Sequence, residues 1–238
     1  MRILGIDTSH ATGSVAVATD EGSITCTDFG AEASHLVELC EAVDGLLGGA
    51  GLDIADIDRV ALVSGPGSFT GLRIGLAFVK GLFAARPLDV VTTTSLELLA
   101  VRCAHRRERV CVMVDARKDE AYAALYVTSG RYPDGEIPRV RAEIGPRAVS
   151  PGEFLTSLEI CPTLFVGSGA VRYERLVRDT FGDAATMAEA HRPSTELLCR
   201  IAPALEPVDA GTIPELEPVY IRPSGAVLKP LRKMRNDG

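Results

Sequence analysis

Short apolar runs and helix-spaced apolar residues alternate along the first hundred positions and predict a mixed α/β fold. Apolar or alternating runs at 3–7, 14–19 and 24–29 are separated by turn residues, which is typical of three strands in a meander. Apolar residues at helical spacing then predict a helix from about 34 to 48. Beyond it we expect, in order, strand 60–63, helix 69–85, strand 89–94 and helix 95–103.

The same order of elements starts again near residue 110. Val110–Asp115 resembles Ile3–Asp7, since both are apolar runs closed by an aspartate, and the strand, glycines and helix of 164–170 match those of 61–71. Recurrence at similar offsets indicates a duplicated lobe. We therefore predict an α/β protein with two ribonuclease-H-like lobes, as in actin-like ATPases and sugar kinases, the second lobe smaller and degenerate. The expected boundaries are 1–105 and 106–205, followed by an extended, proline-rich and basic tail over 206–238.

The predicted helix 69–85 is apolar around nearly all of its surface. Its only charged residues are Arg73 and Lys80, and glycines stand at 71 and 75. A helix that is apolar all round is buried all round, and a glycine costs a helix about 1 kcal/mol relative to alanine. We expect this helix to pack on its own sheet and also on a second partner, with Gly71 and Gly75 allowing close approach.

Composition and charge argue against a nucleic-acid-binding, membrane or secreted protein. The 238 residues are 46% hydrophobic and carry a formal net charge of −7, so the chain is a poor stand-alone nucleic-acid binder except locally, at Arg102–Arg109 and in its basic tail, Lys229–Arg235. That tail is either a solvated end or a contact for RNA or a partner. No apolar run reaches the length of a membrane span, the start has no signal-peptide pattern, and the six cysteines are scattered. We expect a cytoplasmic protein.

Two aspartates are the weak candidates for cofactor binding. Asp7 and Asp115 each end the first strand of a lobe, where actin-like ATPases hold a metal–nucleotide complex, but both carboxylates could equally brace a turn by accepting backbone N–H groups. The stretch Gly65–Gly71 could cradle an anion at a helix start, although it is not a Walker loop, and a tight turn for helix packing is favoured.

Catalytic and metal-binding patterns are otherwise lacking in the sequence. There is no Gly-x-Ser-x-Gly nucleophile elbow, and the four histidines have no metal-ligand spacing. We therefore predict no catalytic residue and no metal site.

Six ordered motifs resemble one known family. They are Ile6–Ser9, Ser64–Gly75, Thr94–Glu97, Asp115–Lys118, Val166–Ala170 and Pro218–Arg222. Together they resemble the family of the tRNA threonylcarbamoyladenosine biosynthesis protein TsaB, also called YeaZ, along nearly the whole chain. The Gly-Pro-Gly-Ser-Phe-Thr-Gly-Leu-Arg segment is the most specific of them.

The resemblance implies an accessory role rather than an enzyme. In this family a non-catalytic subunit binds and activates a TsaD-like transferase, which moves a threonylcarbamoyl group onto adenosine 37 of tRNA, the t6A modification. A TsaE-like ATPase completes the complex. The resemblance thus implies contact with tRNA only through the complex, no cofactor bound by this chain alone, and ATP used by the complex. The alternative is a stand-alone enzyme of the actin-like ATPase or peptidase type.

A comparison with the transferase supports the accessory interpretation. The transferase carries a His-x-Glu-x-His metal site, and the matching positions here hold Ser95 and Leu99. Neither serine nor leucine can replace an imidazole ligand.

The resemblance also implies that the first-lobe helices pair with the transferase, or with a second copy when the transferase is absent. We expect the partner interface to include Leu36, Leu39, Gly71, Leu72, Arg73, Gly75, Leu76 and Val79.

Overall fold

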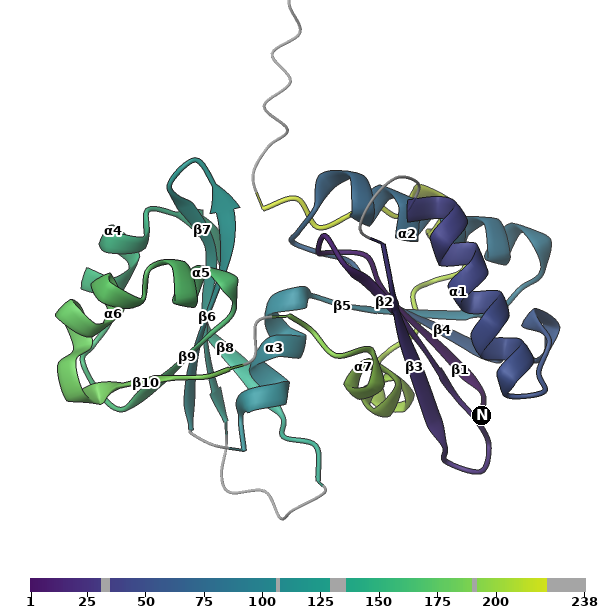
Figure 1. Ribbon diagram of the computed structural model, residues 1–238, viewed down its shortest axis with the longest axis horizontal. Coiled ribbons are helices and arrows are strands. Elements are labelled where there is room, and N and C mark those ends of the chain that lie inside the picture. The colour runs from purple at the N-terminus through teal and green to yellow at the C-terminus, as the bar shows by residue number, and fades with distance from the viewer. Residues whose placement is uncertain (31–34, 106–107, 129–135, 190–191, 222–238) are drawn as a thin grey trace, which may run out of the picture.

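Two five-stranded sheets form the framework of the protein (Figure 1). The computed structural model describes residues 1–30, 35–105, 108–128, 136–189 and 192–221. The basic tail expected at Lys229–Arg235 lies outside this range.

The first sheet has the order β3-β2-β1-β4-β5. Its strands are β1 (Ile3–Asp7), β2 (Gly13–Ala18), β3 (Ile24–Phe29), β4 (Arg59–Val63) and β5 (Asp89–Thr93). The first three form an antiparallel meander, and β4 and β5 extend the sheet in parallel from β1. The predicted meander is confirmed.

The second sheet repeats this topology, in the order β10-β9-β6-β7-β8. Its strands are β6 (Arg109–Arg117), β7 (Glu120–Thr128), β8 (Val140–Val149), β9 (Thr163–Val166) and β10 (Ala185–Met187). Strands β6, β7 and β8 are antiparallel, and β9 and β10 continue in parallel from β6. The predicted duplication and the ribonuclease-H-like, actin-like fold class are confirmed.

Seven α-helices and four short 3-10 turns complete the described part of the chain. The helices are α1 (His35–Gly49), α2 (Phe69–Ala85), α3 (Ser95–Cys103), α4 (Pro151–Thr156), α5 (Ser168–Arg172), α6 (Glu174–Phe181) and α7 (Thr195–Ile201). The 3-10 turns are η1 (Ile54–Asp56), η2 (Gly182–Ala184), η3 (Ala202–Ala204) and η4 (Ile213–Glu215). Hydroxyl caps fix the starts of α2, α3 and α7, where Ser68, Thr94 and Ser194 accept from backbone N–H groups.

Each sheet is covered by helices on both faces. Helices α1 and α2 share one face of the first sheet, where Leu39, Val43, Leu76 and Val79 are buried against strand residues. Helices α4, α5 and α6 cover the outer face of the second sheet.

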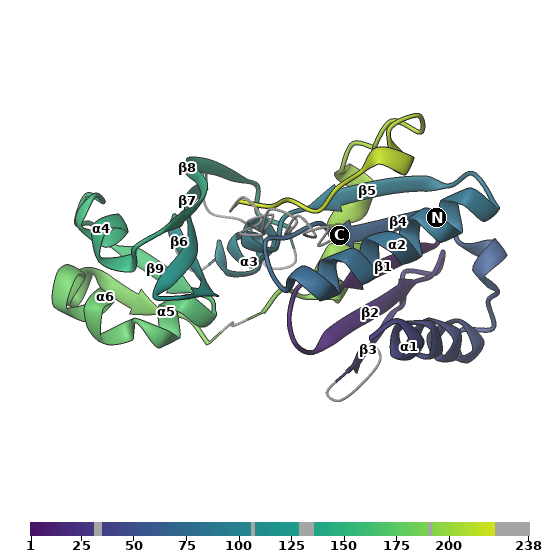
Figure 2. The same ribbon diagram turned by 90° about the horizontal axis from the view of Figure 1, so that it is seen from above.

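Two helices pack across the boundary expected at residue 105. Helix α3 lies between the two sheets (Figure 1, Figure 2), with Leu98 in the core of the first lobe and Leu96 and Leu99 in that of the second. Helix α7 returns late in the chain and buries Leu198 and Cys199 against the first sheet. The lobes are therefore interleaved in sequence, and α3 rather than α2 is the helix that packs against both of them.

The segment 205–221, which we call the strap, returns across the first lobe and reaches the second. The N–H of Val208 donates to the carbonyl of Val90 on the edge strand β5, and the N–H of Val219 donates to the carbonyl of Ser64. Ile213 is buried in the first core, and Ile221 packs on the core of the second lobe. The strap thus protects part of a sheet edge and ends between the two lobes.

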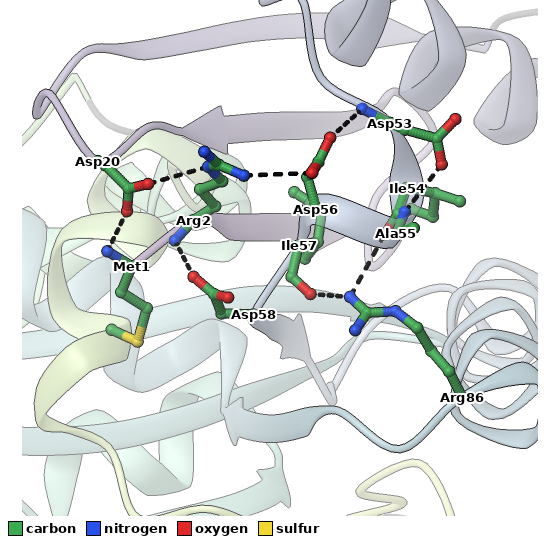
Figure 3. A network of polar contacts seen from close by, with 10 residues as sticks. All are labelled: Met1, Arg2, Asp20, Asp53, Ile54, Ala55, Asp56, Ile57, Asp58 and Arg86. Atoms are coloured by element: carbon green, nitrogen blue, oxygen red, sulfur yellow. Dashed lines mark hydrogen bonds and ion pairs between the residues drawn. The ribbon is translucent and has the colours of Figure 1, made fainter.

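A polar network ties the start of the chain to the loop before β4 (Figure 3). The terminal ammonium of Met1 and the guanidinium of Arg2 both pair with Asp20, and Arg2 also pairs with Asp56. At the other side of η1, Arg86 donates to the carbonyl of Ile57. The network lies at the opposite end of β1 from Asp7, so it fixes the strand without touching the space between the lobes.

No disulfide joins the cysteines in the described part of the chain, and their environments differ. Cys103, Cys111 and Cys199 are buried, whereas Cys26 and Cys40 are exposed. Burial raises the pKa of the Cys199 thiol to about 12, so this thiol stays protonated and behaves as a small apolar group. None of the helices in the described part of the chain combines the length and hydrophobicity that a membrane crossing needs.

Candidate functional site

A cleft of about 620 Å³ separates the two lobes where β1 and β6 end. Its lining comes from the β1–β2 turn, the N-terminus of α2, the end of β6 and the start of α5. The lining residues are Ser9, His10, Ala11, Gly67, Ser68, Phe69, Thr70, Val114, Asp115, Ala116, Arg117, Tyr122 and Ser168. Both duplicated strands thus contribute equivalent turns to one space, as the sequence repeat predicts.

Asp7 lies beneath the cleft rather than in its lining. It is only 4% exposed, and its Oδ1 accepts from the N–H of Ser9 at 2.8 Å. The carbonyl of Ser9 in turn accepts from the N–H of Ser68 at 2.7 Å. The carboxylate therefore braces the β1–β2 turn against the start of α2, which is the structural alternative that the sequence left open.

Asp115 occupies the equivalent place in the second lobe and does line the cleft. Its Oδ1 accepts from the N–H of Arg117 at 3.0 Å, as Asp7 accepts from Ser9. Both of its oxygens also accept from Nη1 of Arg172 at 2.9 Å. The hydrogen bonds that Arg172 donates to Asp115 raise the pKa of Arg172 above its ordinary value.

Arg172 also reaches Asp119, with Nη2 at 3.2 Å from Oδ1. The guanidinium of Arg172 therefore lies beside Asp115, the carboxylate that was a candidate for holding a metal–nucleotide complex. Sequence reasoning missed this pair because Asp115 and Arg172 belong to β6 and α5, far apart in the chain. Only the recurrence of the strand–glycine–helix pattern could have suggested that they meet.

His10 is a second cleft residue that sequence reasoning did not single out. Its Nδ1 lies 2.9 Å from Oγ of Ser9, and its Nε2 is buried and has no hydrogen-bond partner among the residues that the structure describes. Burial is the main cause that lowers the pKa of His10; the carboxylate of Asp7 opposes it and Arg192 adds to it. The imidazole is therefore neutral near pH 7.

The two glycines expected to meet a partner face this chain's own turn instead. A Cβ on Gly71 would lie 2.0 Å from the carbonyl oxygen of Thr8, and one on Gly75 would lie 2.4 Å from the Thr8 hydroxyl. Their close approach is used within the lobe, so assigning them to an interface is corrected. Substitution of Gly75 by leucine would consequently disturb the monomer rather than pairing alone.

Several other residues expected at the interface are core residues as well. Leu39 and Val79 are fully buried, and Leu72 and Leu76 are nearly so, because all four point from the helices toward the first sheet or its flanks. Leu36 and Arg73 are exposed and remain available to a partner. The pairing surface as a whole stays a prediction.

The outward face of α1 and α2 carries other residues that fit close packing. Leu36 and Val37 are 46% and 54% exposed. Gly45, Gly48 and Gly81 are exposed helical glycines whose added Cβ would meet nothing within 4 Å. None of the described residues requires these three glycines. We therefore apply to them the interpretation first given to Gly71 and Gly75, that a helical glycine allows a partner to approach closely.

Ser95 and Leu99, which stand at the positions of the transferase's metal histidines, hold the fold together in this chain. The hydroxyl of Ser95 donates to the carbonyl of Pro66 at 2.6 Å, which fixes the turn before α2. Leu99 is fully buried in the core of the second lobe. Among the described residues, no group of three or more His, Cys, Asp or Glu side chains is placed to hold a metal ion.

Comparisons with known proteins agree with this architecture. The family model described as "TsaD: tRNA N6-adenosine threonylcarbamoyltransferase" matches residues 29–147, half of the chain. The tRNA threonylcarbamoyladenosine biosynthesis protein TsaB of Haemophilus influenzae is 28% identical, with 93% of this chain and 94% of that protein aligned. TsaB of Bacillus subtilis is 27% identical, with 96% and 97% aligned.

A solved structure extends the likeness from sequence to fold. The structure of YeaZ from Pseudomonas aeruginosa superposes with a TM-score of 0.74 at 28% identity, covering 92% of this chain and 99% of that one. The sequence matches extend along nearly the full length, and the superposition of the fold agrees with them. The chain belongs to the TsaB (YeaZ) family.

Proposed function

We propose that this chain is a non-catalytic subunit that pairs with a TsaD-like transferase and supports threonylcarbamoyl transfer to adenosine 37 of tRNA. Membership of the TsaB family supports a role in threonylcarbamoyladenosine biosynthesis. The observation that carries the accessory role is the outward face of α1 and α2, which combines Leu36 and Val37 with the unfilled glycines 45, 48 and 81.

The pairing step rests on the physical chemistry of this face. Exposed helical glycines each destabilise the isolated chain by about 1 kcal/mol relative to alanine, and they permit two helix backbones to approach closely. The exposed side chains of Leu36 and Val37 supply apolar area that a partner can remove from water. Such a face fits a second helix pair, which either a TsaD-like transferase or another copy of this fold would offer.

The matched family model is named for the transferase itself, so a catalytic role has to be weighed. Ser95 and Leu99 stand at the positions of its metal histidines, and both are committed to packing. Asp115, in the cleft, is paired with Arg172, and Asp7, beneath the cleft, is bonded to its own turn. These contacts leave none of the four side chains free for catalysis, which favours a supporting subunit. In this proposal the complex uses ATP, and a TsaE-like ATPase is the third partner.

A reconstituted transfer assay tests the proposal. The TsaD-like and TsaE-like proteins of the same cell are supplied with threonylcarbamoyl-adenylate and unmodified tRNA, with and without this chain. We expect transfer to depend on the chain, and the chain alone to transfer nothing. Transfer at an unchanged rate without the chain would refute the accessory role, and transfer by the chain alone would make it the enzyme.

A matched pair of variants tests the surface. Gly81→Leu adds bulk to the outward face of α2 at a position where a Cβ would meet nothing within 4 Å, and Gly145→Leu adds the same bulk at an exposed position of β8 where a Cβ would also meet nothing within 4 Å. We expect Gly81→Leu to weaken pairing by sedimentation and Gly145→Leu to leave it unchanged, with both chains folded by circular dichroism. Equal pairing by the two variants would show that the interface does not include this face of α2.

A further inference from the structure

The charges on the two outward helices are segregated by sign. The acidic side chains of α1 are Glu38, Glu41 and Asp44, and this helix has no lysine or arginine. The charged side chains of α2 are Arg73 and Lys80, both basic. Among the described residues, no ion pair involves any of these side chains. Their charges are therefore available to a partner.

The charged side chains lie along the same exposed stripes as the features already assigned to pairing. On α1, Val37, Glu41, Asp44 and Gly48 follow one another at helical spacing, and all four are exposed. On α2, Arg73 precedes the exposed glycine at 81 by eight residues, which places both on one side of the helix. The outward face thus has an acidic helix beside a basic one.

Arg73 is held in a fixed orientation by two aromatic residues. Its guanidinium lies over the Phe69 ring, 3.9 Å from the ring centroid, and its Nε donates to the hydroxyl of Tyr220 at 3.0 Å. The centroids of these two rings are 5.5 Å apart. Nη1 and Nη2 have no acceptor among the described residues. These two nitrogens form a planar fork that matches the two oxygens of a carboxylate.

The surroundings of Arg73 favour a single carboxylate over a polyanion. Arg73 and Lys80 line a groove of about 260 Å³ between α2 and the strap, and Glu217 is the acidic residue of its lining. A nucleic acid would bring a row of phosphates close to Glu217 and to the acids of α1, in a protein whose net charge is −7. A protein helix can instead present one acid to Arg73 and a basic residue to α1.

We propose that Arg73 receives a carboxylate of the TsaD-like partner, whose surface is acidic where it covers α2 and basic where it covers α1. This inference rests on the proposed function and adds to it the charge pattern that the partner carries. Tyr220 is a positioning residue in this arrangement, because its hydroxyl fixes the direction of the guanidinium. A guanidinium that is already oriented loses less side-chain entropy when the partner binds.

Pairing of the full chain with the TsaD-like transferase of the same cell, measured by surface plasmon resonance, tests the anchor. Arg73→Gln removes the charge and should weaken pairing by at least about tenfold. Arg73→Lys keeps the charge but not the fork, so it should associate at a similar rate and dissociate faster. Arg141→Gln removes the same charge from an exposed position of β8 and should change the affinity by less than about twofold. Circular dichroism checks that each variant is folded.

A double-mutant cycle tests the role of Tyr220. Tyr220→Phe keeps the ring but removes the hydroxyl that holds Nε, and it should weaken pairing by about threefold. Added to Arg73→Gln, it should cause no further loss, because both residues act through one contact. Losses that add up in the double variant would overturn the positioning role.

Charge reversal on α1 tests the other half of the pattern. Glu41→Lys combined with Asp44→Lys should slow association at low salt by about tenfold, and the difference should shrink as salt is added. Glu159→Lys combined with Asp183→Lys changes the net charge equally at exposed positions of the second lobe. Equal association rates for these two double variants would overturn the polarity assigned to α1.

The outcomes separate this inference from the proposed function. If Arg73→Gln pairs as tightly as the natural chain, the carboxylate anchor is overturned and the accessory role stands. If the natural chain does not pair with the transferase at all, the proposed function is refuted and the inference falls with it. If Arg73→Gln pairs normally but binds tRNA less tightly than the natural chain, Arg73 receives a phosphate, which also overturns the inference.

Discussion

Two glycines of α2, Gly71 and Gly81, allow a direct test of how that helix is used. Both are helical, but a Cβ on Gly71 would lie 2.0 Å from the carbonyl oxygen of Thr8, and a Cβ on Gly81 would meet nothing within 4 Å. Cβ atoms do not approach backbone closer than 3.0 Å, so Gly71→Ala forces the helix or the β1–β2 turn to move by about 1 Å.

The two substitutions should change the free energy of unfolding in opposite directions. Overpacking of this kind costs about 1–3 kcal/mol, and Ser9 and Asp7 hold the turn so that it cannot yield freely. Gly81→Ala instead removes an exposed glycine from a helix interior and should stabilise the isolated chain by about 1 kcal/mol. For a chain of this size each kcal/mol changes the melting temperature by about 2–4 °C.

Urea unfolding and thermal melts of the two variants and the unmodified chain, followed by circular dichroism, measure the difference. Gly81→Ala should melt above the unmodified chain and Gly71→Ala below it. If Gly71→Ala is as stable as the unmodified chain, then Thr8 does not fix the start of α2, and the correction of its expected interface role fails. If Gly81→Ala destabilises the chain, that face is already packed.

Three further predictions concern the cleft and the terminal network. Because burial lowers the folded-state pKa of His10 from 6.5, the unfolded chain binds the proton more tightly, and stability should fall as pH drops below about 6.5. His10→Asn should lessen that fall in pH-dependent urea titrations, and His105→Asn, at an exposed position, should not. Arg172→Ala should leave the midpoint of thermal unfolding nearly unchanged, because its pair with Asp115 is exposed to solvent; a clear fall in that midpoint would mean that the bridge holds the second lobe together. Arg86→Ala should cost about 2 kcal/mol in urea unfolding, since it removes a charged donor from the carbonyl of Ile57, and an unchanged midpoint would contradict that bond.

Local patterns in the sequence predict the elements well, because each is set by neighbouring residues. Helix α2 begins and ends where the apolar spacing and the Ser68 cap place it, and the strand that ends at Asp7 recurs as β6, which runs two residues past Asp115. The duplication itself follows from order and offset alone.

What the sequence could not provide is the direction in which a side chain points. Gly71 and Gly75 do require a close neighbour, but only the structure identifies it as Thr8 of the same chain. In the same way, an apolar helix does not reveal whether it is covered by a partner or by a later helix, and α3 is covered by both lobes of its own chain. The bridge from Asp115 to Arg172 joins residues whose separation in sequence leaves no local signal.

The interleaving of α3 and α7 has a consequence for the order in which the protein can mature during synthesis. The inner face of the first sheet needs Leu198 and Cys199 of α7, which leave the ribosome only after nearly the whole second lobe has been made. Until then, Ala16, Ala61 and Val91 lack the layer that removes them from water. A nascent chain stopped before residue 195 should therefore expose an apolar sheet and attract chaperones, and the first half expressed alone should not behave as an independent domain.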